Sequence, residues 1–378
     1  MDLTLTEDQE LIQNTAREVL ESRGATANAR AMEADPAGYS AGLWKEMVEL
    51  GWMGLALPES YGGIGAGFLE VCLVIEELGR FQVPSPFLPT VVCCGLPIAR
   101  FSTEAQKAAW LEAITRGRVM SYAGVAPRPG SDIVAAETDE GFVLDGTAPF
   151  VPYADAAEDL LVVARPPDGG PEELTALLVD AASPGITREP LEVIGIDRQC
   201  RVGFEGVTVP GDRVLGGADA AGRGQPAAEA IAALGAAATC AEMVGGAQRV
   251  LDMTLEYAAQ REQFGRPVGS FQAVQHHCAN MAMDVLSSRF IAYEAIWRLS
   301  EDLDAAETPM AVSMAKAWVS EAYGRVCSLG HQVHGAIGYT REHDLHFYYR
   351  HAMASALTFG DGDFHWDRVA GHLGLPLP

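Results

Sequence analysis

The spacing of apolar residues changes twice along the chain, and these changes constrain the fold more than any other feature of the sequence. From Leu3 to about Arg116, apolar residues recur every three or four positions, which is the spacing of amphipathic helices. Between about Val119 and Val214 the pattern becomes short apolar runs broken by Pro, Gly and Asp, which is typical of antiparallel strands. Helical spacing returns from about Gln225.

These changes predict an α+β fold with three parts. We expect an N-terminal helical domain at residues 1–117, a central antiparallel β domain at residues 118–224 and a C-terminal helical bundle at residues 225–378. A chain of 378 residues exceeds the usual capacity of one hydrophobic core, so more than one packed unit is expected. The Gly- and Ala-rich segment at 215–224 is the best boundary between the last two parts.

The charge balance argues against two kinds of partner. The chain has 51 acidic and 26 basic residues and a formal net charge of -25, which repels nucleic acid and anionic membranes. We find no basic run that offsets this charge, no secretory leader, and no apolar stretch of membrane-spanning length. We therefore expect a cytoplasmic protein that binds neither nucleic acid nor membrane.

Three motifs carry a more specific resemblance. They are GWMGLALPESYGG at residues 51–63, REQFGRPVGSFQAVQHHCANM at residues 261–281 and QVHGAIGYTREHDLHFYYR at residues 332–350. Together with the helix, sheet, helix order, these motifs make the chain similar to the acyl-CoA dehydrogenase family over essentially its full length. One position departs, because the family usually has Gly where this chain has Ala336.

The resemblance implies a reaction and a set of partners. Such enzymes remove the α proton of an acyl-CoA thioester with a carboxylate base and pass the β hydrogen as hydride to FAD. The proton is weakly acidic, so the site must polarise the carbonyl and hold a base of raised pKa, while the flavin accepts two electrons that no side chain can accept. The expected partners are an acyl-CoA substrate, an electron-transfer flavoprotein or similar acceptor, and further subunits in a homo- or hetero-tetramer.

In the family, FAD lies across a subunit interface, and the half-site for the ADP end matches this sequence well. An arginine can pair with the pyrophosphate through two hydrogen bonds, while phenylalanine and glutamine offer a stacking wall and an amide. Without the resemblance, a surface arginine beside core aromatics would be the preferred interpretation. The matching cofactor-binding candidates are Arg261, Gln263, Phe264, Phe271, Gln272, Gln332 and Gly335.

The half-site for the isoalloxazine matches less well. The family commonly has TEPxAGSD and WIT here, whereas this chain has VAPRPGSD at residues 125–132 and FVP at residues 150–152. Gly130 and Ser131 match and could meet a pyrophosphate, and Phe150 stands in the place of the tryptophan. These three residues complete the cofactor-binding candidates.

The remaining positions of this half-site depart from the family. Val125 and Ala126 replace Thr and Glu. Pro152 supplies neither the hydroxyl nor the backbone N–H of the threonine that it replaces. The alternative is ordinary drift in a loop, with the flavin held by other backbone groups.

The position of the catalytic base is ambiguous. The family commonly has a glutamate in YEGTxQxxR, and counting from Arg350 without gaps places Phe359 there, whose ring cannot accept a proton. A two-residue insertion would instead place Asp361 there, and we name Asp361 as the candidate catalytic residue. A minority of the family carries the base on the first long C-terminal helix, where this chain has Gly235 and its nearest glutamates lie about two turns away.

The stretch TFGDGDFHWDR at residues 358–368 also raises the question of a metal site. Asp361, Asp363 and His365 lack a closed ligand set of known spacing, and the family needs no metal. His343 and His346 could share one helix face, but solvated or capping roles are favoured. We expect no metal.

Three functions remain open from the sequence. The chain could be a subunit that shares its FAD site and its base with a related partner, which the unequal half-sites favour. It could be a self-sufficient homo-oligomeric dehydrogenase with Asp361 as base. It could also be an oxygen-using oxidase or monooxygenase relative, which would reoxidise its flavin rapidly in air. The acyl group, in fatty acid or steroid side-chain metabolism, is not determined by the sequence.

Overall fold

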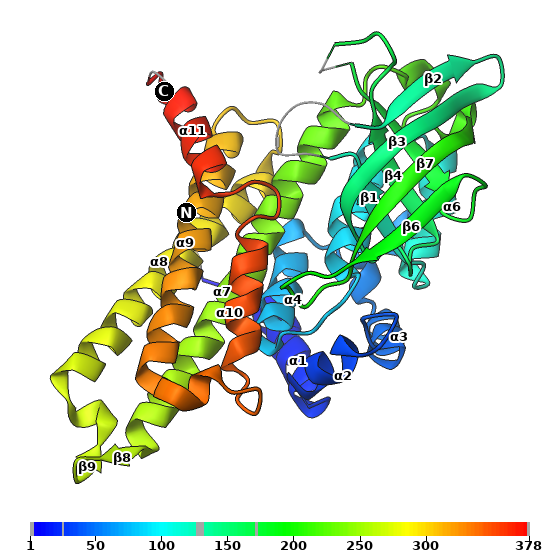
Figure 1. The fold of residues 1–378 in the computed structure, drawn as a ribbon. Coiled ribbons are helices and arrows are strands. Elements are labelled where there is room, and N and C mark those ends of the chain that lie inside the picture. The colour runs from blue at the N-terminus through cyan, green and yellow to red at the C-terminus, as the bar shows by residue number, and fades with distance from the viewer. Residues whose placement is uncertain (1–3, 25, 126–131, 171–172, 376–378) are drawn as a thin grey trace.

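The structure is a computed structural model in which three parts follow one another along the chain (Figure 1). It describes residues 4–24, 26–125, 132–170 and 173–375. Helices form the first and last parts and strands form the part between them, so the predicted α+β architecture is confirmed. The domain limits at residues 117 and 224 stay predictions.

The N-terminal helices begin at residues that cap them. Thr6 caps α1 (Glu7–Ser22) and Thr103 caps α6 (Glu104–Thr115), each through a reciprocal pair of hydrogen bonds with the glutamine three residues later. The other elements of this part are α2 (Thr26–Glu33), α3 (Ala41–Glu49), η1 (Trp52–Gly54), η2 (Glu59–Tyr61), α4 (Phe68–Phe81), the π-helical η3 (Leu88–Gly95) and α5 (Leu96–Phe101).

Helix α4 packs directly on α7 (Gln225–Gln260), and two glycines allow the close approach. A Cβ added at Gly79 would overlap the backbone of Glu242, and a Cβ added at Gly245 would overlap the backbone of Glu76. The two helix backbones therefore touch where they cross. This contact joins the N-terminal part to the bundle in one continuous hydrophobic core.

The strands form two sheets that share a second core. One sheet has the order β1-β4-β5, and the other has the order β2-β3-β7-β6. Strand β1 pairs with β4 in parallel, with Met120 opposite Asp159, and the remaining pairs in both sheets are antiparallel. The strands are β1 (Met120–Ala123), β2 (Val134–Thr138), β3 (Gly141–Pro152), β4 (Asp159–Ala164), β5 (Thr175–Asp180), β6 (Ile186–Leu191) and β7 (Gln199–Pro210), followed by η4 (Gly211–Arg213) and η5 (Ala218–Ala220).

The C-terminal part is a bundle of long helices around α7. A short hairpin between α7 and α8 lies at the end of the bundle far from the sheets (Figure 1). Helix α11 and the loop before it lie toward the other end. The elements after α7 are β8 (Glu262–Gln263), β9 (Arg266–Pro267), η6 (Val268–Ser270), α8 (Gln272–Glu301), α9 (Thr308–His334), η7 (Gly335–Tyr339), α10 (Leu345–Ser355) and α11 (Gly362–His372).

Helix α7 corrects one prediction from the sequence, which was that no apolar stretch reaches membrane-spanning length. By length and composition alone, α7 is apolar enough to cross a membrane. However, 83% of its most apolar window is buried inside the fold, where it packs against α4, α8 and α9. A helix covered on all sides has no polar face, so its apolar composition follows from its central place in the bundle.

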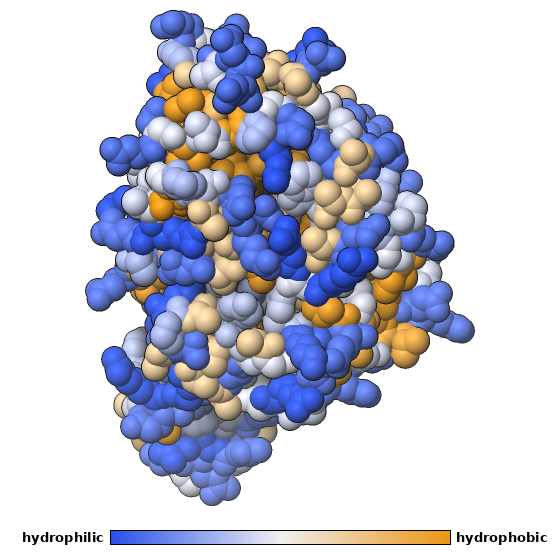
Figure 2. All heavy atoms as spheres, turned by 90° about the vertical axis from the view of Figure 1, so that its right-hand side faces the viewer, coloured by the Kyte–Doolittle hydropathy of each residue, from blue (hydrophilic) through white to orange (hydrophobic). Residues whose placement is uncertain are grey.

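The outer face on the sheet side of the molecule is mostly hydrophilic. Figure 2 shows this face with hydrophilic residues over most of it and apolar residues in separate patches. This distribution agrees with the acidic composition of the chain. Other exposed apolar side chains lie on the bundle, among them Phe264, Met283 and Leu286.

Candidate functional site

The candidate residues for the ADP end surround the β8–β9 hairpin. Arg261 follows the last residue of α7, Gln263 lies in β8, and Phe271 and Gln272 open α8. Phe264 stands at the turn of the hairpin and is 91% exposed. The structure therefore brings the residues of the second motif together at one end of the bundle, on its surface.

The hairpin presents cationic and aromatic groups side by side. The guanidinium of Arg266 lies 4.1 Å from the ring centroid of Phe271, which in turn meets Phe264 edge to face at 6.1 Å. The Arg261 side chain is exposed, and within the described residues no carboxylate lies within ion-pair distance of it. Unpaired guanidinium donors beside an open aromatic surface suit a phosphate and a flat heterocycle.

Gln332 and Gly335 lie at the same end of the bundle. Gln332 is exposed in the last turn of α9, and Gly335 ends that helix with a φ of 65°, which glycine adopts without strain. The ring of Tyr257, near the end of α7, stacks on His334 at 4.5 Å, and its hydroxyl donates to the His334 carbonyl at 3.3 Å. This contact holds the end of α9 beside the end of α7.

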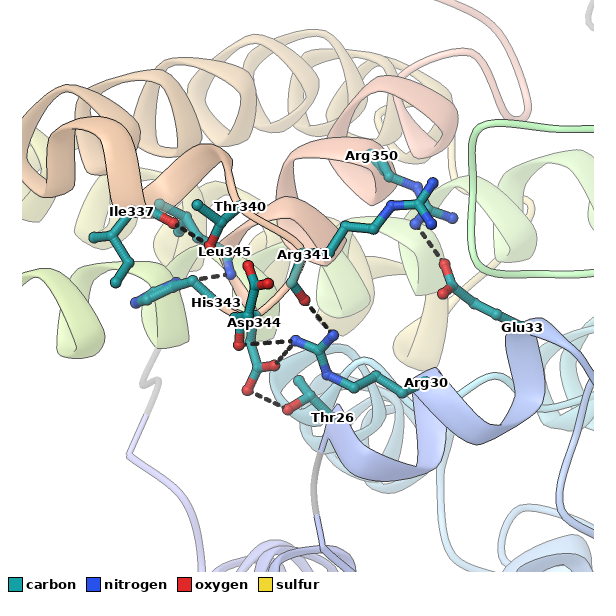
Figure 3. Close-up of polar contacts among 11 residues, drawn as sticks. Thr26, Arg30, Glu33, Ile337, Thr340, Arg341, His343, Asp344, Leu345 and Arg350 are labelled. Carbon is teal, nitrogen blue, oxygen red and sulfur yellow. Dashed lines mark hydrogen bonds and ion pairs between the residues drawn. The ribbon is translucent and has the colours of Figure 1, made fainter.

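The loop that follows η7 is tied to the N-terminal helix α2 (Figure 3). The guanidinium of Arg30 pairs with Asp344 at 2.6 Å, and the Thr26 hydroxyl donates to the same carboxylate at 2.5 Å. A second ion pair, 2.5 Å long, joins Arg350 of α10 to Glu33. The end of α9 that carries Gln332 is therefore held by α7, and the loop after η7 is held by α2.

The candidates for the isoalloxazine end are less complete. Gly130 and Ser131 lie outside the described residues. Phe150 lies in β3, where the pairing with β7 is irregular, and it is 64% exposed with a φ of 57°. Pro152 ends β3, and its carbonyl accepts a hydrogen bond from the Ser121 hydroxyl at 2.5 Å. Because proline has no backbone N–H, Pro152 offers no backbone donor at this place.

Phe359 occupies the space above Gly235. A Cβ added at Gly235 would overlap the Phe359 ring, so the ring touches the backbone of α7. On its other side, Phe359 stacks on Tyr122 of β1, with ring centroids 5.6 Å apart and planes 22° apart. A third flat ring between two others would need about 7 Å, or two contacts of about 3.5 Å. No such layer fits between Tyr122 and Phe359.

Asp361, the predicted base, lies at the start of α11. It is the N-cap of that helix, and its Oδ1 accepts a hydrogen bond from the backbone N–H of Phe364 at 2.9 Å. Its side chain is exposed, whereas Phe359 faces α7. A capping carboxylate in solvent lacks the dry pocket in which a catalytic base abstracts a weakly acidic proton.

Sequence reasoning missed a cluster of two half-buried acids and a buried histidine between the sheets and the bundle. His351 of α10 lies 3.4 Å from Glu242 of α7, while Asp197 accepts a hydrogen bond from the Tyr153 hydroxyl at 2.6 Å. Burial opposes protonation of His351, but Glu242 and then Asp197 outweigh it, so the pKa of His351 is raised. These residues are far apart in the chain, and no local pattern marks them.

The structure offers no evidence for a metal centre in the part of the chain that it describes. No group of three or more His, Cys, Asp or Glu side chains converges there as metal ligands. In the TFGDGDFHWDR stretch, His365 is buried and hydrogen bonds to the Phe359 carbonyl, while Asp363 and Asp367 are exposed.

Models of known families match both helical parts of the chain. The acyl-CoA dehydrogenase N-terminal domain matches residues 6–118, and the acyl-CoA dehydrogenase C-terminal domain matches residues 222–374. The chain belongs to the acyl-CoA dehydrogenase family. The predicted enzyme class, an FAD-dependent oxidoreductase that acts on CH–CH bonds, is confirmed by this membership.

Individual relatives agree over the full length. Acyl-CoA dehydrogenase FadE27 of Mycobacterium tuberculosis is 30% identical over 99% of this chain and 99% of its own length. The solved ChsE4-ChsE5 complex of Mycobacterium tuberculosis contains a chain with 29% identity and a TM-score of 0.90, covering 100% of both chains. A chain of Tcur3481-Tcur3483, described as a steroid ACAD, has 30% identity and a TM-score of 0.88 over 98% of this chain and 99% of that one.

Acyl-CoA dehydrogenases use FAD, and two regions of this bundle fit that cofactor differently. The hairpin end fits, because exposed cationic, amide and aromatic groups converge there. The region at Gly235 offers neither a carboxylate base nor open space, because Phe359 fills it and is in direct contact with Tyr122. Arg261, directly after α7, is 26 residues beyond Gly235 (261 minus 235), or about 39 Å along the helix axis at 1.5 Å per residue. The two regions thus belong to different half-sites.

Proposed function

We propose that this chain is a subunit of a heteromeric acyl-CoA dehydrogenase. It gives the ADP-end half of an FAD site to a related partner chain, and the partner gives the flavin-end half and the catalytic base. The observation that carries the proposal is the direct contact of Phe359 with Tyr122 over Gly235, while Arg261 stays exposed. In a homo-oligomer every chain must supply both halves and a base, so a missing base and a filled space beside α7 would disable every site.

In this arrangement the chain binds and orients the cofactor of its partner. Arg261 pairs with the pyrophosphate, Phe271 offers its ring for stacking, and the amides of Gln272 and Gln332 supply hydrogen bonds, with Gln263 and Phe264 beside them. Bound FAD supplies the hydride acceptor for α,β-dehydrogenation of an acyl-CoA thioester. Gly130, Ser131 and Phe150 belong to the half-site that this chain does not complete.

The relatives support a shared site and suggest a substrate class. Two of the similar solved structures carry the names of two different chains, ChsE4-ChsE5 and Tcur3481-Tcur3483, and the second is described as a steroid ACAD. We propose that the assembly acts on a bulky acyl-CoA, such as a steroid side chain attached to CoA, and that a fatty acyl-CoA is the alternative. The residues that contact the acyl group would then belong to the partner.

The surface of α8 supports assembly through the bundle. Its exposed apolar residues are spaced three, four and seven positions apart, so they lie along one side of the helix. An exposed apolar stripe of this kind is typical of a subunit interface. We propose that it contributes to a tetramer arranged as a dimer of dimers. The residues are Met283, Leu286, Phe290 and Trp297.

We propose two further properties with the function. The electron acceptor is an electron-transfer flavoprotein or a similar protein, as the family resemblance implies. The protein is cytoplasmic, which agrees with the net charge of -25 and with the buried position of α7.

The test is the FAD content of the purified chain alone and of the chain co-expressed with a related partner. We expect little flavin in the chain alone and about one FAD per pair of chains in the co-purified assembly. Acyl-CoA should bleach that flavin under anaerobic conditions, and the reduced flavin should persist on exposure to air.

Other results would replace the proposal with one of its alternatives. A full complement of FAD in the chain alone, together with loss of acyl-CoA oxidation in Asp361→Asn, would establish a self-sufficient enzyme. Rapid reoxidation of the reduced flavin in air would instead indicate an oxidase or monooxygenase.

A further inference from the structure

Lys316 is a fully buried lysine beneath the loop that carries Phe359. It comes from α9 and has no exposed surface. Its Nζ donates hydrogen bonds to the Ser320 hydroxyl at 3.0 Å and to the carbonyls of Ala356 at 3.1 Å and Gly360 at 3.0 Å. An ammonium group has three donors, so these contacts satisfy it completely.

The loop needs such support because its backbone is unusual. Phe359 has a φ of 58°, a backbone conformation that residues other than glycine rarely adopt, and Gly360 has a φ of 106°. Besides the two bonds from Lys316, the loop receives one from the buried His365, whose Nε2 lies 3.0 Å from the Phe359 carbonyl. The Phe359 ring therefore projects from a backbone segment that Lys316 and His365 both bind.

We propose that Lys316 is a positioning residue that holds Phe359 over Gly235 and so keeps closed the space beside α7 in which the resemblance places a catalytic base. The two carbonyls that Lys316 binds belong to residues 356 and 360, on either side of Phe359. These bonds fix the backbone from which the ring projects toward Gly235 and Tyr122.

The environment of Lys316 agrees with a role in holding the loop. Among the described residues, no carboxylate lies within ion-pair distance of Nζ, so hydrogen bonds to the loop and to Ser320 offset the cost of burying the charge. Burial lowers the pKa of Lys316 to about 8, although Cys240 and Asp361 oppose this shift. Lys316 is thus still largely charged near neutral pH.

The role given to the space beside Gly235 rests on the proposed function, whereas the contacts of Lys316 do not depend on it. Hydrogen exchange, followed by mass spectrometry on the full-length chain in its native assembly, tests it. In Lys316→Met, peptides that cover residues 356–361 should exchange at least tenfold faster than in the wild type. Peptides from α7 and α8 should keep their rates, and the control Lys45→Met, at an exposed lysine of α3, should match the wild type.

Two results would overturn the inference. Equal exchange of residues 356–361 in Lys316→Met and the wild type would show that the lysine does not hold the loop. A similar acceleration in α7 and α8 would show a general structural role. If Lys316→Met does not fold, Lys316→Gln keeps an N–H donor without the charge, and we expect at least threefold faster exchange in the same peptides; an unchanged rate overturns the inference.

The alkylation rate of a thiol introduced at residue 359 measures how accessible the side chain at that position is. In a Phe359→Cys background, Lys316→Met should increase the alkylation rate of the introduced thiol by iodoacetamide at least tenfold, measured by peptide mass. The buried thiols of Cys72 and Cys327 report global opening in the same sample and should remain unreacted. An unchanged rate at residue 359 overturns the inference.

The FAD content of the same samples separates this inference from the proposed function. A full complement of FAD in the chain alone would contradict the division of the site between two chains. The exchange and alkylation rates would still decide whether Lys316 holds the loop, because neither measurement requires bound cofactor.

Discussion

The hairpin end of α7 and the region around Gly235 differ in what they leave open. At the hairpin, Arg261 and Phe264 are exposed and have few contacts within the chain. Around Gly235, a phenyl ring fills the space next to the helix, and Lys316 fixes the loop that carries it. One end of α7 therefore carries exposed groups with room for a ligand, whereas the helix is closely packed around Gly235.

Under the proposed function, the exposed hairpin is the half of the shared FAD site that this subunit supplies, and the filled region at Gly235 belongs to the half that it does not. Exposed aromatic rings leave apolar surface in water that a ligand or a second chain can cover, and a neighbouring unpaired guanidinium can bind an anionic group of that ligand. A filled space next to a glycine indicates the opposite, because the fold gains packing where a cofactor would otherwise lie. The predictions below test each end separately.

The largest effect is expected at the hairpin. Arg261→Ala in the assembly with its partner should weaken FAD binding by about 100-fold or about 2.8 kcal/mol, because a charge-assisted contact to the pyrophosphate is lost. Fluorescence titration of the apo-assembly with FAD measures this. The matched control is Arg201→Ala, at an exposed arginine of β7 that pairs with Glu189. Equal FAD affinity in Arg261→Ala and the wild type would contradict a cofactor role for the hairpin.

The next effect concerns the charge under the closed loop and depends on pH. The pKa of Lys316 is about 8 in the folded chain and 10.5 in its ordinary state, so unfolding takes up a proton between these values. The free energy of unfolding of the wild type relative to Lys316→Met should therefore rise between pH 8 and pH 10.5, by at most about 1.4 kcal/mol per pH unit. Below pH 8 the difference should level off.

Denaturant unfolding at pH 7.5, 9 and 10 measures this difference. Comparison of the two proteins removes the contributions of other groups that titrate in the same range. A constant difference across all three pH values would show that the pKa of Lys316 is not lowered by its burial.

A smaller effect is expected from the glycine under the ring. Gly235→Ala should lower the free energy of unfolding by about 1–2 kcal/mol, since the overlap with Phe359 outweighs the gain in helix propensity. Gly371→Ala in α11 is the control, because a Cβ there meets no atom within 4 Å, and it should be neutral or slightly stabilising. Adding Phe359→Ala to Gly235→Ala should remove the overlap. A Gly235→Ala chain as stable as the wild type would refute close packing at this place.

The smallest effect is expected from Asp361. Asparagine caps helices about as well as aspartate, so Asp361→Asn should change the free energy of unfolding by only a few tenths of a kcal/mol. Acyl-CoA oxidation by the assembly should stay within twofold of the wild type if, as we propose, the partner supplies the base. Steady-state kinetics measures this, and a loss of more than 100-fold would make Asp361 the base.

The sequence predicted much of the fold and part of the site. The order of helices, strands and helices follows from the spacing of apolar residues, which depends on neighbours within one or two turns and is visible in the chain itself. The grouping of Arg261 with Gln272 was predictable for the same reason, since one continuous motif carries both. The apolar composition of α7 was visible too, but its meaning depended on the helices that cover it.

The residue that lies next to Gly235, at the expected position of the base, could be identified only from the tertiary structure. From the sequence, either Phe359 or Asp361 could take the place of the base, because one insertion changes the count. The folded chain has Phe359 against Gly235 and Asp361 as the cap of α11, and it gives Lys316 a role that no motif indicated. Such contacts join residues far apart in the chain, and their free energy depends on which groups share a space. Local spacing carries no information about that choice.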